Sequence, residues 1–354
     1  MKKTEFLIVG QGLAGTMLAF NMLERGIDFR IVNSANKSKA SIVAAGMINP
    51  LVYKRLTKSW MVDELLPEMI WNFQHLEKIL GKSFYFSKKI LKPLSEQETN
   101  LWKKKITLPG FDFYIEDIVG ESPVRGIKTA PAYGIVQQAG YLNLSVFLAH
   151  AESFFYKKGL LIEEDFQVTD NMDINKEIEC GGYKAEKVVF CEGYHLSRNP
   201  LFNFVKMNPA KGEVLLIHAP DLSEEYILNK KVFVLPVGDQ RFKVGSTYEW
   251  EDLSEEPTEK GKASILERLD QLIGLDYTIE NHWAGVRPTI ADRRPLLGQH
   301  PEHKNVFVFN GLGTKGVMLA PHFAGVMCDF LSGENKRLPD EVNVQRFKEI
   351  HPVT

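Results

Sequence analysis

The sequence predicts an α/β fold combined with an α+β part, in which a parallel-sheet domain is interleaved with an antiparallel-sheet domain. The first observation is length: 354 residues exceed the usual size of one compact core, which favours two domains. The second is that strand–turn–helix patterns, typical of parallel sheets, occur near both ends of the chain and in its middle. The third is the stretch over residues 212–247, which has the alternation and turns of antiparallel strands.

The first parallel unit begins at the N-terminus. Residues 4–9 form a short apolar run that ends in Gly10, as a buried strand does. Residues 13–25 carry apolar side chains at helical spacing, and Gly26 follows as a stop. A second strand is expected over residues 28–33. Strand, helix and strand together predict the βαβ-type unit that opens a parallel sheet.

The same rules place the remaining elements in chain order. Helices are expected over residues 60–80, 95–105, 143–158 and 260–273. Strands are expected over residues 84–93 and 134–136, within 160–173, and over 187–191, 213–218, 231–235, 241–244 and 305–309. An apolar helix follows the last strand, and we expect it to kink or restart at Pro321, because proline interrupts helical hydrogen bonding. This order assigns residues 1–60, 140–205 and 283–354 to the first domain, and residues 61–139 and 206–282 to the second.

Composition excludes several function classes. The net charge is -2, from 43 basic and 45 acidic residues, so no bulk attraction to nucleic acid or an anionic membrane follows. The three cysteines lack metal-ligand spacing and fit a reducing compartment. The run from His300 to His303 contains Pro301, which suits a polar loop better than a metal site. From the cysteine spacing and the histidine run we expect no bound metal. No stretch is long and apolar enough to span a membrane, and we expect a cytoplasmic protein.

A glycine-rich turn connects the first strand to the first helix. Its glycines are Gly10, Gly12 and Gly15, with Leu13 and Ala14 between the last two. Gly10 permits the tight turn, Gly12 lets the backbone approach a pyrophosphate, and Gly15 lets the helix pack on the strand. The helix N-terminus then offers N–H groups and a positive dipole end to the phosphates. The pattern predicts a Rossmann-like dinucleotide site, the alternative being a merely structural turn.

The second strand ends differently from the usual pattern. An acidic residue normally stands there and binds the adenosine ribose. This sequence has Asn33, followed by Ser34. Asparagine can hydrogen-bond a hydroxyl as a neutral partner, which weakens the motif without cancelling it.

Four further segments follow in a characteristic order. They are the run from Ala44 to Pro50, the strand closing at Cys191 to Gly193, the run from Trp283 to Pro288 leading to Pro295 to Gly298, and the turn from Gly311 to Gly316 before an apolar helix. In this order the chain resembles the D-amino-acid oxidase and glycine oxidase family of FAD enzymes. It is also similar to the oxidoreductase domain of the bacterial enzyme that removes a carboxymethyl group from modified tRNA wobble uridine. The resemblance runs from about Glu5 to Leu331 and is patchy between Trp60 and Ala139.

The resemblance implies a fold and a cofactor. The first domain becomes a Rossmann-like FAD-binding domain with a parallel sheet, and the second a substrate domain with an antiparallel sheet. FAD is expected to be non-covalent, since no cysteine lies between Arg287 and Asp292, where some relatives attach it. The implied cofactor-binding residues are Gly10, Gly12, Leu13, Ala14, Gly15, Asn33, Ser34, Ala45, Gly46, Val168, Cys191, Gly193, Arg287, Gly311, Gly313, Thr314, Lys315 and Gly316.

The turn from Gly311 to Gly316 has its own physical rationale. A reduced flavin anion carries charge at N1 and O2 of its ring. A glycine-rich turn that leads into a helix supplies N–H donors and a positive dipole end for that charge. Lys315 would add a full positive charge, and we name it as a catalytic candidate. The alternative is a plain strand–turn–helix connection.

Arg287 is the principal candidate for substrate binding. Glycine oxidase has an arginine at the matching position that clamps the substrate carboxylate, and a guanidinium fork suits that role. The alternative is a structural ion pair with a residue such as Asp292. Thr314 and Lys315 stand where the family has a second polar contact, so strict glycine specificity is not implied.

Two other groups of residues lie near the implied pocket. Lys54, Arg55 and Lys58 follow the flavin-proximal segment and either bind an anionic substrate or face solvent, and Lys58 completes the catalytic candidates. Tyr248 and Trp250 either form a wall of the pocket or belong to the core.

These observations predict an FAD-dependent oxidoreductase. It would oxidise the C–N bond of a small anionic amine or amino acid to an imine, which then hydrolyses, and pass the electrons to oxygen or another acceptor. Oxidase and dehydrogenase remain equally open, and a homo-oligomer is compatible with the sequence. The alternatives are flavin-dependent tRNA wobble-uridine modification, an NAD-dependent dehydrogenase and a non-catalytic flavin-binding protein.

Overall fold

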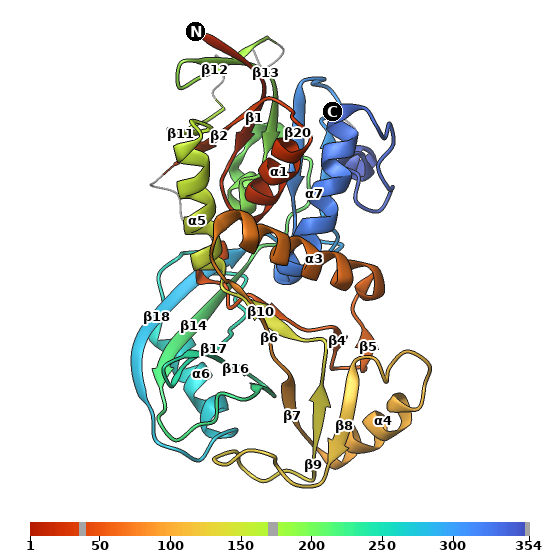
Figure 1. The fold of residues 1–354 in the computed structure, drawn as a ribbon, viewed down its shortest axis with the longest axis vertical. Helices are drawn as coiled ribbons and strands as arrows, with labels where there is room; N and C mark the ends of the chain where they lie inside the picture. Colours follow the sequence, from red (N-terminus) through yellow and green to blue (C-terminus); the bar gives the residue numbers. More distant parts are fainter. Residues whose placement is uncertain (35–39, 169–175, 351–354) are drawn as a thin grey trace.

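A computed structural model describes residues 1–34, 40–168 and 176–350. The molecule has two parts, with the N- and C-termini at the same end (Figure 1). The first part is built on a seven-stranded sheet in the order β11-β2-β1-β13-β20-β19, with β12 beside β13. Its strands are β1 (Lys2–Val9), β2 (Phe29–Asn33), β11 (Leu161–Glu163), β12 (Ile178–Cys180), β13 (Tyr183–Phe190), β19 (Leu296–Gln299) and β20 (Val306–Asn310).

The five strands from β11 to β20 in this order are parallel, and β12 and β19 pair antiparallel. Their apolar side chains are buried on both faces, as expected where helices cover a parallel sheet. Helices α1 (Leu13–Glu24) and α7 (Gly316–Ser332) lie side by side, and α5 (Leu144–Lys157) lies next to α1 (Figure 1). Since β2 and β13 flank β1, the strand order reverses at the end of β1, where such sheets bind ligands.

The second part is built on an eight-stranded sheet in the order β18-β14-β17-β16-β15-β7-β9-β8. Its strands are β7 (Ile90–Leu94), β8 (Ile115–Val119), β9 (Ala132–Val136), β14 (Ala210–His218), β15 (Ile227–Asn229), β16 (Phe233–Gly238), β17 (Arg241–Gly245) and β18 (Thr278–Arg287). Helix α6 (Glu259–Asp270) packs on one face through Ile265 and Leu269, against Leu215 and Val244. The opposite face looks toward the first part of the molecule.

Smaller elements join the two sheets. A three-stranded sheet contains β3 (Met47–Ile48), β6 (Tyr85–Ser87) and β10 (Gly140–Leu142), and β4 (Leu51–Val52) pairs with β5 (Thr57–Lys58). Helix α3 (Val62–Leu80) crosses between the two parts (Figure 1). Helix α4 (Glu96–Ile106) lies against β8 and β9. The short helices are α2 (Ala40–Val43), η1 (Gly193–Arg198), η2 (Pro200–Phe202), η3 (Gly313–Lys315) and η4 (Val344–Ile350). The sheets, and so the two parts, are each assembled from segments far apart in sequence.

The predicted combination of parallel and antiparallel sheets is confirmed, but several elements differ from expectation. The single strand expected over residues 84–93 is two strands, β6 and β7, which pair with different neighbours because the chain turns between them. The ten-residue strand β18 was not predicted, because four of its residues are exposed and its glycine breaks the alternation. The domain boundary predicted at residue 283 falls inside this strand. Of the strand expected within 160–173, residues 169–173 lie outside the described part.

Of the kink or restart expected at Pro321, the restart does not occur. Helix α7 continues as one helix from Gly316 to Ser332, with proline at its sixth position. Pro321 is buried, as are Ala320 and Phe323, so packing outweighs the loss of one intrahelical hydrogen bond. In the described ranges, no helix combines the length and the apolar character needed to cross a bilayer.

Two glycine-to-alanine substitutions should have opposite effects on the free energy of unfolding. A Cβ atom on Gly15 in α1 would lie 2.0 Å from the Gly10 carbonyl oxygen, so Gly15→Ala must push α1 away from β1. A Cβ atom on Gly325 in α7 would meet only the Asn21 side chain, at 3.7 Å. We expect Gly15→Ala to destabilise the protein by about 1–3 kcal/mol, and Gly325→Ala to stabilise it by about 0.5–1 kcal/mol. Urea denaturation of the apoprotein measures both, and equal effects would contradict the packing argument.

Candidate functional site

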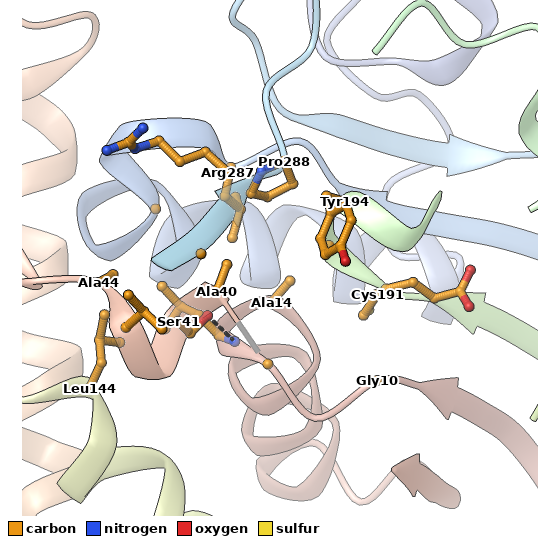
Figure 2. A pocket seen from close by; sticks show the side chains of 18 of the residues that line it. Gly10, Ala14, Ala40, Ser41, Ala44, Leu144, Cys191, Tyr194, Arg287 and Pro288 are labelled. Carbon is orange, nitrogen blue, oxygen red and sulfur yellow. Dashed lines mark hydrogen bonds between the residues drawn. The ribbon is translucent and has the colours of Figure 1, made fainter. Parts of the chain in front are cut away.

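A deep pocket begins at the carboxyl end of β1 and extends to the large sheet. Both parts of the molecule line it, from the glycine-rich turn at Gly10 to the face of β14 and β18 at Gly212 and Arg287. Figure 2 shows Arg287 and Pro288 on one side, Ala40 and Ser41 of α2 with the following Ala44 opposite, and Cys191 with Tyr194 just after β13. The pocket therefore connects the strand-order reversal of the parallel sheet to the second sheet.

The glycine-rich turn fits a pyrophosphate. Gly10 has a φ of 102°, and this backbone conformation bends the chain from β1 into α1. The Gly10 N–H donates to the Val32 carbonyl of β2 at 2.8 Å. Gly12 has no side chain that could cap α1, and the first turn of α1 carries no acidic residue. The Leu13 N–H donates to the Ser41 hydroxyl at 3.4 Å, and a Cβ atom on Gly12 would meet only that hydroxyl, at 3.8 Å, so open space faces the helix N-terminus. A positive helix end beside such a space suits the phosphates of a dinucleotide. Leu13 and Ala14 also line the pocket, whereas Gly15 lies beneath the turn.

The end of β2 forms the next part of the wall. Asn33, which is 7% exposed, and Ser34 both line the pocket. Val168 packs against the neighbouring core and is not part of the described lining, to which Glu164 and Phe166 belong instead. Glu164 was missed by sequence reasoning. It directly follows β11, whose last residue Glu163 pairs with Asn33, so a carboxylate at the end of the adjacent parallel strand was the available signal.

Small residues form the wall opposite. Ala45 and Gly46 line the pocket as predicted, next to Ala40 of α2 and to Ala44, which follows that helix (Figure 2). Gly46 has a φ of 69°, and a Cβ atom there would lie 1.9 Å from the Leu142 carbonyl oxygen. The chain can therefore pass close to β10 at this position only as glycine. The short side chains leave room for a flat ring system.

The end of β13 contributes Cys191 and Gly193. Both line the pocket, and the Cys191 N–H donates to the Val9 carbonyl at 2.8 Å, which fixes it beside the glycine-rich turn. Burial raises the pKa of the Cys191 thiol far above its usual range, so the sulfur stays protonated and uncharged at neutral pH. Tyr194 and His195 of η1 also line the pocket. No sequence motif distinguished these two residues.

The C-terminal glycine-rich turn reaches the pocket beside η1. Asn310 is buried and joins the turn to η1, since its amide donates to the Gly193 carbonyl at 3.0 Å. Gly313, Thr314 and Gly316 line the pocket, while Gly311 packs under the turn against Ile290. Helix α7 begins here without a side-chain cap or an acidic residue in its first turn. Its N-terminus therefore offers a second positive end to the same cavity.

Lys315 and Lys58 do not line the described pocket. The Lys315 ammonium donates to the Asn49 carbonyl at 3.0 Å and also to the Ser59 hydroxyl. Burial lowers the pKa of Lys315 to about 8. Lys58 is paired with Asp63 at 2.9 Å and lies over the Tyr114 ring. Of the three predicted catalytic residues, Arg287 alone is among the described lining residues.

Arg287 ends β18 on the face of the sheet that looks into the pocket. Its Nη2 donates to the Ser246 hydroxyl at 2.7 Å and to the Thr247 carbonyl at 3.2 Å, and its Nη1 donates to the Lys211 carbonyl at 3.3 Å. The guanidinium lies 4.3 Å from the centre of the Tyr248 ring. A Cβ atom on residue 212 would collide with it at 2.0 Å, so Gly212 is required for this conformation.

The charge of Arg287 is not compensated by a carboxylate in the described part of the chain. The expected alternative partner, Asp292, is bound to Arg346 at 2.7 Å instead. Burial lowers the pKa of Arg287, but guanidinium remains protonated at any physiological pH. A partly buried cation held by three neutral acceptors is poised to bind an anion.

The run from His300 to His303 forms a loop, as its proline suggested. His300 is buried, and its Nε2 lies 2.7 Å from the Leu201 carbonyl oxygen. Its Nδ1 accepts the backbone N–H groups of Glu302 and His303. Both ring nitrogens therefore have a structural role. In the residues for which coordinates are described, no three His, Cys, Asp or Glu side chains form a metal-binding group.

Comparison with known proteins agrees with this geometry. A family model described as "FAD dependent oxidoreductase" matches residues 5–330. The chain is 22% identical over 358 residues to a glycine oxidase of Bacillus subtilis (strain 168), covering 92% of each protein. It is 23% identical over 378 residues to a tRNA 5-methylaminomethyl-2-thiouridine biosynthesis bifunctional protein of Marinobacter nauticus, covering 96% of this chain and 58% of that one.

The fold has solved counterparts. An iminodiacetate oxidase from Chelativorans sp. BNC1 has a TM-score of 0.81 at 18% identity, covering 95% of this chain and 98% of that one. The structural match includes both the parallel-sheet part and the large antiparallel sheet, since nearly the whole chain is covered. With the family model spanning the glycine-rich turn, the pocket and helix α7, the chain belongs to the family of FAD-dependent oxidoreductases.

Proposed function

We propose that this protein uses non-covalently bound FAD to oxidise the C–N bond of an amine that carries a carboxylate. The observation that carries the proposal is Arg287, a partly buried cation on the pocket wall for which no carboxylate partner is found in the described part of the chain. The parallel-sheet part would hold the cofactor, and the face of the large sheet would hold the substrate. The product would be an imine, which water hydrolyses to a carbonyl compound, releasing ammonia from a primary amine or the shorter amine from a secondary one.

The residues of the pocket divide into cofactor and substrate groups. Gly12 and the N-terminus of α1 would receive the pyrophosphate, and Asn33 with Glu164 would face the ribose. The turn at Gly313 and the N-terminus of α7 would face the pyrimidine end of the ring, where hydrogen-bond donors and a positive dipole stabilise negative charge. When bound, FAD supplies the acceptor for the two electrons that leave the amine.

Arg287 would orient the substrate by its carboxylate. Ser246, Thr247 and Lys211 hold the guanidinium before substrate arrives, so little side-chain entropy is lost on binding. Val214 and Phe233 provide an apolar wall on the same side of the pocket. An apolar surrounding favours the uncharged amine, which is the form that can donate hydride. The electrons would then pass from the cofactor to oxygen or another acceptor.

The relatives support a carboxylate-bearing amine as the substrate class. One relative is a glycine oxidase and one structural neighbour is an iminodiacetate oxidase, both named for substrates that join an amine to a carboxylate. At 22% and 18% identity these two proteins do not fix a substrate, so the substrate of this chain is inferred from Arg287 itself. The tRNA-modifying relative also contains segments outside the part that this chain matches.

Gly12→Val should abolish FAD binding and leave the chain folded. The valine side chain would fill the space beside the helix N-terminus, while Gly12 has an extended backbone conformation that valine adopts readily. We expect the purified variant to lack the flavin absorbance band and to keep the wild-type apoprotein melting temperature within a few degrees. Full flavin content in this variant would show that the phosphates lie elsewhere.

Acid treatment should release the flavin from the wild-type protein. Arg287 to Asp292 contain no cysteine, and the Cys191 thiol in the pocket is kept protonated by burial, which makes it a poor nucleophile. After precipitation with trichloroacetic acid, we expect the yellow colour in the supernatant, with the mass of FAD. Colour that stays in the washed pellet would instead indicate a covalent link.

Arg287→Lys should weaken catalysis with carboxylate-bearing amines. Lysine keeps the charge but loses the planar fork, so one charge-assisted contact worth roughly 1.5–3 kcal/mol is lost. We expect kcat/KM to fall by about one to two powers of ten, while flavin content and reduction by uncharged amines change little. Arg346→Lys is the matched control, because Arg346 is paired with Asp292 and does not line the pocket. Equal losses with charged and uncharged amines would show that Arg287 is structural.

A further inference from the structure

Two large aromatic side chains lie exposed at the substrate side of the pocket. Tyr248 is 53% exposed and Trp250 is 56% exposed, so together they form a contiguous aromatic surface. Their rings stack with centroids 6.0 Å apart and an interplanar angle of 28°. Tyr248 lines the pocket and covers Arg287, so the pair extends the substrate wall outward from the proposed carboxylate site.

The segment that carries this pair is fixed to the sheet. The backbone of Glu249 exchanges two hydrogen bonds with Lys211 of β14, at 2.8 and 3.0 Å. The side chain of Lys211 is fully buried and binds Asp252 at 2.6 Å and the Ser254 hydroxyl at 3.0 Å. The aromatic pair is therefore held in one orientation without a ligand, as a preformed binding surface is.

The surroundings of the pair are acidic. Residues 249–256 contain five acidic side chains and no basic one, and Glu251 and Glu256 are exposed. Lys211 compensates Asp252, and Lys260 lies 3.7 Å from Glu249. The exposed Glu251 and Glu256 thus give the segment a negative charge near the rings of Tyr248 and Trp250. Both features attract a cation and repel an anion, because aromatic faces bind ammonium and guanidinium groups.

We propose that Tyr248 and Trp250 form an outer subsite for a cationic group at the far end of the substrate. On the function proposed above, the substrate is then an amino acid with a basic side chain. Its carboxylate binds Arg287, its amine faces the cofactor, and its distal ammonium or guanidinium group lies against Trp250. The carboxylate neutralises Arg287, so the two positive groups are separated by a negative one.

Binding of non-reacting ligands tests the subsite without requiring turnover. The two probes are hexanoate and 6-(trimethylammonio)hexanoate, which share a carboxylate and chain length but differ in the distal cation. Their dissociation constants are measured by the change in flavin absorbance of the holoprotein. We expect the cationic probe to bind about three- to fivefold more tightly at low ionic strength, and salt to reduce this preference. Equal binding of the two probes would overturn the proposal, whatever reaction the protein catalyses.

Substitutions identify the residues responsible. Trp250→Ala should remove most of the preference for the cationic probe, and Glu251→Gln should reduce it by a smaller factor. Trp71→Ala is the matched control, since Trp71 is 62% exposed, also stacks on a neighbouring ring, and lies on α3 away from the pocket lining. An unchanged preference for the cationic probe in Trp250→Ala would refute the assignment. So would a change in solution mass that occurs in Trp250→Ala but not in Trp71→Ala, because the aromatic pair would then be an interface between copies of the chain.

Turnover then links the subsite to the reaction. The ratio of kcat/KM for lysine to that for norleucine, measured with both enantiomers, should exceed one in the wild type and fall in Trp250→Ala. Reduction of the flavin by neither amino acid, together with tighter binding of the cationic probe, would contradict the proposed function and leave the subsite standing. Equal kcat/KM values for lysine and norleucine would contradict the subsite and leave C–N oxidation standing.

Discussion

The close approach of α1 to β1 and β13 is the constraint on which the rest of the structure depends. Gly15 brings the first turn of α1 against the carbonyl of Gly10, so closely that no side chain fits between them. This contact aims the helix N-terminus at the end of β1, where the strand order reverses. A second helix end, that of α7, is brought to the same cavity by the buried amide of Asn310. On the proposed placement of FAD, both ends of the extended dinucleotide would face the positive end of a helix dipole.

The proposed substrate side follows a different electrostatic principle. Partial burial of the Arg287 guanidinium without a carboxylate partner in the described part of the chain is costly, and the cost is offset by three oxygen acceptors and a tyrosine ring. Neutral acceptors hold the group in place without cancelling its charge. A carboxylate partner in the protein would have stabilised the fold more simply and removed the attraction for a substrate anion. The acidic, aromatic segment that follows Ser246 then adds the opposite charge preference farther out.

The interleaved chain path lets one pocket combine these two environments. Strand β18 ends at Arg287 in the large sheet, and the chain then continues into β19 of the parallel sheet. Lys315 also connects distant chain segments, since its side chain is not part of the described pocket lining and donates to the carbonyl of Asn49. Its ammonium joins the turn before α7 to the segment after β3, so its role visible in the structure is to connect chain segments.

The sequence by itself determined the parallel sheet, the glycine-rich turns and the family, because those features rest on local spacing: Gly10 to Gly15 need no distant partner to be recognised. It also indicated Arg287, whose segment carries a motif. Tertiary structure alone decided which charged residues face the pocket. Lys58 and Lys315 find partners in Asp63 and Asn49, which pattern analysis cannot pair. Strand β18 and Glu164 escaped prediction for the same physical reason, since sheet register and the meeting of adjacent strand ends are set by long-range pairing and not by neighbours in sequence.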